Sequence, residues 1–386
     1  MIRYFLMSAL SKKKVLEQLK LMIMESDVAG KAMASIVPRE MNTDIVRDYL
    51  EQQKAVNADA HRVLEALIGS VTHVSKDKMF GDLKRLAEDF LRSINEKHIE
   101  NPRSHYYYGN DDGADEPERD SRFYICLAGH NRKDSMNSAC HFKSNMFLSL
   151  MMLSLCPDLL PNFVDFLCMG KPLHEEEIDA SVGNFVYVDD ASFSGSQAAE
   201  TVLAVKKTLG ESWIFMDYPR KLYVLMLYVN PDIKDTINSR LGVRGTEWLT
   251  SEVYPVSVNE ALESQGFEIG DEEERIVKIF LKGLGIGQRI LPDLQKPLFY
   301  TDLKVADSFS IDPSFFFNPV IIKSDGVSVK PYEHSLITDC AMASSDGDKN
   351  RAIEGVFCPK GVYKSDQWKD YILDKFKLDR TRWIES

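Results

Sequence analysis

Two adjacent carboxylates follow a short apolar run near the middle of the chain. Residues 185–188 have the composition of a buried strand, and Asp189 and Asp190 come directly after them. Carboxylates accept hydrogen bonds from the vicinal hydroxyls of a ribose, and open α/β sheets bind ligands at the carboxyl ends of their strands. The acid pair therefore predicts a ribose-binding position.

The next residues are small and mostly polar, and they lead into an amphipathic helix expected over 196–209. They are Ala191, Ser192, Phe193, Ser194, Gly195, Ser196 and Gln197. A helix N-terminus presents unpaired backbone N–H groups, and Gly195 permits close approach of a phosphate. The helix dipole contributes only about 0.3–1 kcal/mol when exposed, so most of the affinity must come from N–H and Ser hydroxyl hydrogen bonds. The segment 191–197 is predicted to hold a phosphate.

An apolar strand, an Asp-Asp pair and a short loop of Ser, Gly and small residues resemble the donor-binding signature of type I phosphoribosyltransferases. Ser194 stands where this family more often has Thr, and Gln197 where a hydroxyl residue is usual. The resemblance implies that Asp189 and Asp190 contact the ribose hydroxyls of phosphoribosyl diphosphate and that the backbone of 191–197 grips its 5′-phosphate.

A second loop fits the same resemblance. A strand expected over 123–128 precedes Gly129, and Arg132 and Lys133 follow before the next helix. Such enzymes hold pyrophosphate on a first-strand loop of this kind. Cations there would stabilise the charge of the leaving group more in the transition state than in the ground state, and Mg²⁺ would bind mainly through the diphosphate. The alternative is that Arg132 and Lys133 are a solvated surface pair.

The resemblance extends over about residues 43–340, which are similar to the phosphoribosyltransferase-like effectors of bacterial conflict systems, some of them linked to retrons. A helical lead-in, the sheet and the segment 298–308 carry this part, with Ala306 where Pro is expected before Asp307. It implies an anti-phage role and partner proteins from a defence operon, such as a reverse transcriptase with its RNA or DNA.

Three other interpretations stay open. The acid pair and Ser194 or Ser196 could simply cap the next helix. A protein that keeps the phosphate loop but has lost turnover would be a nucleotide-binding sensor. Residues 187–190 also spell the Y-x-D-D of reverse-transcriptase palms, although a palm needs an antiparallel hairpin at the acids and a third metal-binding Asp upstream.

The surrounding pattern predicts an α/β fold in which a parallel-sheet, phosphoribosyltransferase-like core carries helices on both faces and follows an N-terminal helical layer. Continuous apolar runs separated by helical periodicity indicate strands buried on both faces. We expect four regions: a helical region over 1–98, an acidic surface loop over 99–120, the α/β core over 121–310 and a C-terminal extension over 311–386.

Composition limits the class of protein. The net charge of −12 argues against broad coating of nucleic acid, which rewards clustered Lys and Arg. Six cysteines without a C-x-x-C pair predict a reduced, cytoplasmic setting. The apolar start is only about ten residues long before Lys12, which is too short to span a bilayer. No membrane segment or targeting signal is expected.

Overall fold

The computed structural model describes residues 12–25, 27, 29–30, 33, 40–95, 121–127, 144–168, 171–172, 177–179, 181–192, 196–209, 221–229, 239, 246–251, 256–266, 276, 297–302 and 319–337. They form an α/β protein built on a six-stranded sheet of order β4-β3-β2-β5-β6-β7. Five of these strands run parallel, and β4 alone pairs antiparallel, with β3. The strands are β2 (Phe123–Leu127), β3 (Phe163–Cys168), β4 (Lys171–Pro172), β5 (Asn184–Ser192), β6 (Lys221–Val229) and β7 (Thr246–Thr250).

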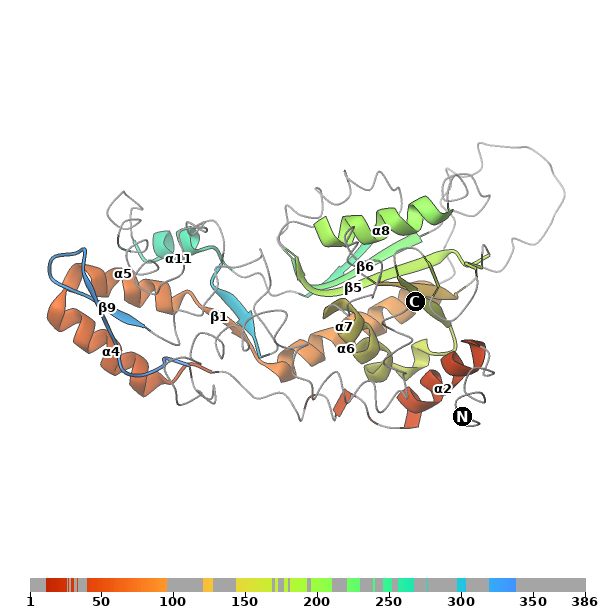
Figure 1. Cartoon of the computed structure of the whole chain (residues 1–386), viewed down its shortest axis with the longest axis horizontal. Helices are drawn as coiled ribbons and strands as arrows, with labels where there is room; N and C mark the ends of the chain where they lie inside the picture. The colour runs from red at the N-terminus through yellow and green to blue at the C-terminus, as the bar shows by residue number, and fades with distance from the viewer. Residues whose placement is uncertain are drawn as a thin grey trace, which may run out of the picture.

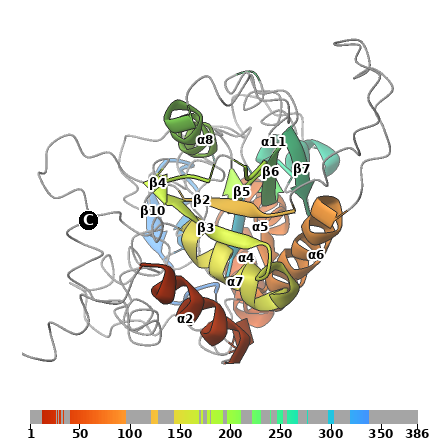
Figure 2. The ribbon, with the colours of Figure 1, turned by 90° about the vertical axis from the view of Figure 1, so that its right-hand side faces the viewer.

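The central strands read as apolar runs because helices cover both faces of the sheet. Every residue of β2 is buried, as are all residues of β6 after Lys221. One face carries α8 (Ser196–Leu209), whose Ala198, Val202 and Val205 pack on alternate residues of β2, β5 and β6. Figure 2 shows α8 on one side of the sheet and α2, α6 and α7 on the other.

The second face is covered by α2 (Lys12–Glu25), α6 (Lys76–Asn95) and α7 (Ser144–Leu155). Ser75 caps α6, since its Oγ accepts a hydrogen bond from the N–H of Lys78 at 3.3 Å. Phe90 of α6 is fully buried and meets Phe123 and Tyr223 edge to face, with ring centroids 5.0 and 4.9 Å away. Helix α6 is therefore part of the core, and we call the sheet with α2, α6, α7 and α8 the sheet lobe.

A second lobe has its own apolar cluster. It combines α4 (Thr43–Val56) and α5 (Ala58–Gly69) with α11 (Val258–Ser264) and the antiparallel pair β9 (Val320–Ile322) and β10 (Val329–Pro331). Buried Gln53 joins α4 to β9, because its side chain donates to the carbonyl of Ile322 at 3.0 Å and accepts from the N–H of Ile322 at 2.8 Å. The second lobe thus unites segments from two distant parts of the chain (Figure 1).

A two-stranded parallel sheet lies between the lobes (Figure 1). It consists of β1 (Thr72–Val74) and β8 (Phe299–Thr301). Phe299 belongs to the apolar cluster of the sheet lobe, whereas the next residue, Tyr300, belongs to that of the second lobe. Alternate side chains of one strand therefore connect the two cores.

The parallel sheet with helices on both faces confirms the coarse fold prediction. The helices of residues 1–98 do not form one layer, because α6 packs on the sheet and α4 and α5 build the second lobe. The proposed C-terminal extension contributes β9 and β10 to that same lobe. The predicted loop over 99–120 lies outside the described residues.

Two smaller expectations can be compared with the described residues. Cys126 and Cys156 are buried free thiols, and the cytoplasmic setting stays a prediction. None of the helices in the described ranges combines the length and the hydropathy needed to cross a membrane.

Candidate functional site

The strand order has its reversal point between β2 and β5. From β2 the chain adds β3 and then β4 on one side, and from β5 it adds β6 and β7 on the other. Ligands of open α/β sheets bind outside the carboxyl ends of the strands at such a point. The two predicted loops, 129–135 and 191–197, leave from the carboxyl ends of these two neighbouring strands.

Strand β5 continues past the residues expected to end it. Asp189 and Asp190 lie within the strand, because its pairing with β6 runs on to Ala191 opposite Tyr228 and Ser192 opposite Val229. The expectation that the strand ends at Val188 is wrong for this reason, and Ala191 and Ser192 are strand residues rather than loop residues. Helix α8 begins at Ser196, followed by Gln197, as predicted.

The remaining predicted site residues lie outside the described residues. They are Phe193, Ser194 and Gly195 of the phosphate segment and Gly129, Arg132 and Lys133 of the pyrophosphate loop. What the structure describes is therefore the frame that holds the two loops, namely the end of β2, the end of β5 and the start of α8.

Asp189 is held in one orientation on the face of the sheet that carries α8. Its Oδ2 accepts a hydrogen bond from the hydroxyl of Tyr187 at 2.6 Å, and its Oδ1 accepts one from the N–H of Asp190 at 3.0 Å. The residue is only 5% exposed. A carboxylate oxygen has two lone pairs and can accept two hydrogen bonds.

Asp190 is on the opposite face, because successive side chains of a strand alternate. It is 3% exposed and lies near Tyr228 of β6. Burial is the main cause that raises the pKa of the Tyr228 hydroxyl, and the negative charges of Asp82 and Asp190 raise it further. The carboxylates of Asp82 and Asp190 and the neutral phenol of Tyr228 therefore lie close together, near the carboxyl ends of β5 and β6.

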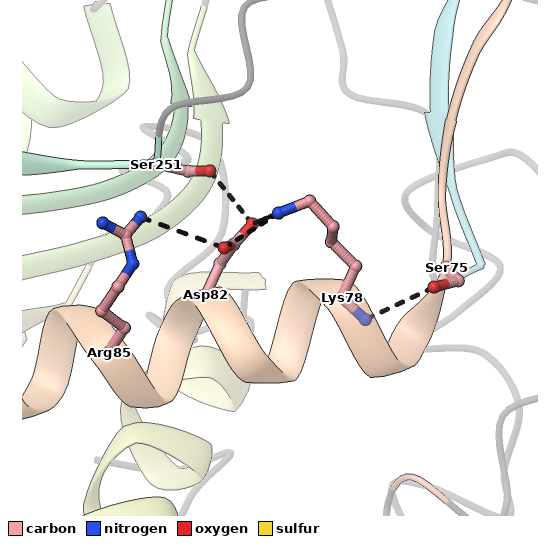
Figure 3. A network of polar contacts seen from close by, with 5 residues as sticks. All are labelled: Ser75, Lys78, Asp82, Arg85 and Ser251. Atoms are coloured by element: carbon pink, nitrogen blue, oxygen red, sulfur yellow. Dashed lines mark hydrogen bonds and ion pairs between the residues drawn. The ribbon is translucent and has the colours of Figure 1, made fainter.

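Helix α6 carries Lys78, whose positive charge lies against the carboxylate of Asp82 in this group. The Nζ of Lys78 lies 3.1 Å from each carboxylate oxygen of Asp82, and the hydroxyl of Ser251, just after β7, donates to Oδ2 of Asp82 at 3.0 Å. Arg85 is farther away, at 3.9 Å. Figure 3 shows Lys78, Arg85 and Ser251 converging on Asp82. No local sequence pattern indicates this network, because its members come from α6 and from the end of β7.

A histidine and an aspartate form a second missed group at the β1–β8 pair. The Nε2 of His73 lies 2.7 Å from Oδ1 of Asp302, and Oδ2 of Asp302 accepts the backbone N–H of Lys76 at 2.7 Å. His73 and Asp302 are 229 positions apart, and no spacing rule relates residues at that separation. Only the pairing of β1 with β8 brings them together.

The candidate site was expected to involve Mg²⁺, bound mainly through the diphosphate of the donor. Within the described ranges there is no cluster of three or more His, Cys, Asp or Glu residues that would hold a metal ion. Mg²⁺ usually keeps several waters and binds to proteins through one or two carboxylates together with the phosphates of the substrate. A magnesium ion at this site would therefore take its ligands mainly from the diphosphate of the donor and from water.

The polymerase-palm interpretation does not fit. The acids lie on a strand that pairs parallel on both sides, with β2 and with β6, and a helix follows. A palm would require an antiparallel hairpin at this position.

The fold and the acid pair define an α/β protein with a candidate ligand site at the point where the strand order reverses. Comparison of the chain with models of known protein families, with curated proteins and with solved structures gives no match.

Proposed function

We propose that the protein binds phosphoribosyl diphosphate with Mg²⁺ and transfers the phosphoribosyl group to an acceptor, with release of pyrophosphate. The observation that carries this proposal is the position of Asp189 and Asp190, near the carboxyl end of β5, beside the reversal point and a few residues before α8. This position supports the proposal, because carboxylates can accept hydrogen bonds from ribose hydroxyls and a helix start can bind a phosphate.

In this proposal the ribose lies across the carboxyl end of β5. Asp189 and Asp190 approach it from the two faces of the strand, and each accepts a hydrogen bond from one ribose hydroxyl. Asp189 is fixed beforehand by Tyr187, so little side-chain entropy is lost when the ribose binds. The 5′-phosphate meets the first turn of α8 and the loop before it.

The pyrophosphate of the donor would lie toward the end of β2, where Gly129, Arg132 and Lys133 follow in the sequence. Positive charge there would act on the leaving group as the bond to the ribose breaks. Bound Mg²⁺ would neutralise charge on the diphosphate. The chain's own residues orient the ribose and the phosphate between these two strand ends.

The anti-phage role and the partners from a defence operon rest on the family resemblance alone. A nucleotide-binding sensor without turnover is the second candidate, and the fixed carboxylates of the frame would serve it equally well. The two functions differ in one product, because only the enzyme releases pyrophosphate.

Isothermal titration of the purified protein with phosphoribosyl diphosphate and Mg²⁺ tests the donor site. We expect Asp190→Asn to weaken binding about 10- to 100-fold, because hydrogen bonds to charged groups contribute about 1.5–3 kcal/mol. Asp158→Asn is the matched control, since Asp158 is exposed on the short helix before β3, away from the carboxyl ends of the strands. Equal binding by the wild type and by both Asp189→Asn and Asp190→Asn would refute the site.

A pyrophosphate-release assay then separates the enzyme from the sensor. It uses the same donor, alone and with each of a panel of free nucleobases. Release that Asp190→Asn abolishes supports transfer. Tight binding of the donor without release in every case supports the sensor instead.

A further inference from the structure

Each carboxylate of the acid pair has a buried tyrosine close to it. On the α8 face, the hydroxyl of Tyr187 donates to Asp189 at 2.6 Å. On the α6 face, Tyr228 lies near Asp190, since it pairs across the strands with Ala191, the next residue of β5. Both tyrosines are 0% exposed. The hydroxyl of Tyr187 therefore holds an acid of the site, and the question is what the hydroxyl of Tyr228 does.

Tyr228 is held in place by its ring. The ring belongs to the apolar cluster on the α6 face and packs against Phe299 of β8, with centroids 5.1 Å apart and planes at 56°. The hydroxyl of Tyr228, in contrast, has no partner with the geometry of a hydrogen bond among the described residues. Buried hydroxyls are usually hydrogen-bonded, so one that is not calls for an explanation, such as a role in binding.

Two carboxylates lie near this hydroxyl, and their charges act on it. They belong to Asp82 and Asp190. Asp82 already accepts other donors, because Lys78 lies 3.1 Å from both of its oxygens and the hydroxyl of Ser251 donates to one of them at 3.0 Å (Figure 3). Burial keeps the phenol of Tyr228 protonated, so it can only donate to a carboxylate. Its proton is therefore most useful to Asp190.

We infer that Tyr228 is the positioning residue of Asp190, and that its hydroxyl donates to this carboxylate when the carboxylate accepts a ribose hydroxyl. The inference rests on the proposed function. A second donor fixes the orientation of the carboxylate and stabilises its charge in a buried place. Each acid of the pair then has its own tyrosine. Tyr187 bonds to Asp189 before the donor arrives, and Tyr228 bonds to Asp190 when it arrives.

The first test is isothermal titration of Tyr228→Phe with phosphoribosyl diphosphate and Mg²⁺. We expect binding to weaken about tenfold, as for the loss of one hydrogen bond to a charged group. The midpoint of urea unfolding should stay the same or rise slightly, because the hydroxyl makes no hydrogen bond among the described residues of the free protein. A tyrosine with a merely structural role would show the reverse, a lower midpoint with unchanged binding.

Two other tyrosines calibrate this result. Tyr187→Phe removes a bond that the free protein already makes, so it should lower the urea midpoint and weaken donor binding together. Tyr332→Phe is the matched control, because the hydroxyl of Tyr332 donates to Asp48 at 2.5 Å in the second lobe. It should lower the urea midpoint and leave donor binding within about twofold of the wild type.

The second test is a double-mutant cycle between Tyr228→Phe and Asp190→Asn. A residue that acts through Asp190 loses its effect when that carboxylate is gone. In the Asp190→Asn background, Tyr228→Phe should therefore weaken donor binding by less than about twofold. Effects of the two substitutions that multiply in full would show that Tyr228 acts independently of Asp190, and would overturn the inference.

The remaining outcomes are also decisive. Unchanged donor binding in Tyr228→Phe overturns the inference, and so does a fall in its urea midpoint as large as that of Tyr187→Phe. In either case the donor site itself survives if Asp190→Asn weakens binding. If the wild type does not bind phosphoribosyl diphosphate, the proposed function fails.

Discussion

The sheet lobe and the second lobe are held together in different ways. In the sheet lobe, large apolar side chains fill both faces of strands that follow one another between residues 123 and 250. The second lobe has an apolar cluster too, and two side chains of α4 also bond directly to the backbone of β9. The hydroxyl of Tyr49 donates to the carbonyl of Val320 at 2.8 Å, and Gln53 makes two bonds to Ile322.

The difference predicts which substitutions lower the free energy of unfolding in each lobe. Apolar packing loses free energy in proportion to the volume removed. A polar attachment loses more when one partner is removed, because the other partner stays buried without a hydrogen bond. The packing of α6 on the sheet should therefore be sensitive to cavities, and the contact between α4 and β9 to the loss of particular donors and acceptors.

The largest expected effect is a cavity in the sheet lobe. Phe90→Ala should lower the free energy of unfolding by about 3–5 kcal/mol, because Phe90 is fully buried between Phe123 and Tyr223. Urea unfolding followed by circular dichroism measures this. Leu203→Ala on α8 is the control, since Leu203 is 39% exposed, and it should cost much less. Equal losses in the two variants would contradict the role given to α6 in the core.

The next effect tests the polar attachment of the second lobe. Gln53→Leu leaves the N–H and carbonyl of Ile322 buried without this partner, at about 1–3 kcal/mol for each group. Hydrogen exchange at Ile322 should accelerate, while the amides of β5 keep their protection. Gln52→Leu is the matched control, because Gln52 is exposed, and it should change stability by no more than about 0.5 kcal/mol. Faster exchange in both lobes would show that they unfold as one unit.

A smaller effect is expected at Asp82, the carboxylate of α6 that lies near Tyr228. Asp82→Asn removes a negative charge near Tyr228. An anion nearby disfavours the phenolate, so its removal should lower the raised pKa of Tyr228 toward the ordinary value. We expect stability to fall by about 1–2 kcal/mol as the charged contact to Lys78 is lost. An alkaline NMR titration of the assigned Tyr228 ring signal measures the pKa, and Asp89→Asn is the control. An unchanged or higher pKa of Tyr228 would contradict the arrangement.

The smallest effect is expected at Cys126, whose thiol should not react with an alkylating reagent in the folded protein. Burial raises the pKa of the Cys126 thiol to about 12, so at pH 8 the thiol is protonated and enclosed between β3 and β5. Iodoacetamide should leave Cys126 unmodified in the folded protein and modify it in urea, as peptide mass spectrometry would show. Modification of folded Cys126 at the unfolded rate would mean that the centre of the sheet opens readily.

The parts of the fold that could be predicted from sequence are those with long periodic signals. The β2 and β6 runs are wholly or almost wholly buried, and α8 spans the same residues in the structure as in the prediction. Strand β7 escaped, because every residue of this edge strand is only half-buried and no apolar run marks it. Helix α11 had a usable signal, the capping box of Ser257 and Glu260, which was overlooked.

The candidate site also has one part that the sequence predicted and another part that it did not. The acid pair and the start of α8 follow one another in the sequence, so a local motif predicted them. The extension of β5 to Ser192 depends on its pairing with β6, which a motif does not contain. Asp82 with Ser251 and His73 with Asp302 are separated by 169 and 229 positions. Such groups arise from topology, and an isolated sequence gives no local sign of them.

The parallel pairing of β1 with β8 also determines when the molecule can be completed during synthesis. Thr72, His73 and Val74 leave the ribosome long before Phe299, Tyr300 and Thr301, their partners in the register. At about 5–20 residues per second, the separation of 227 positions between these partners (299 − 72) is a delay of roughly 10–50 seconds. All six strands of the large sheet emerge within that interval. On the nascent chain the sheet lobe can therefore fold first. Until β9 and β10 are synthesised, the apolar face of α4 and α5 stays uncovered.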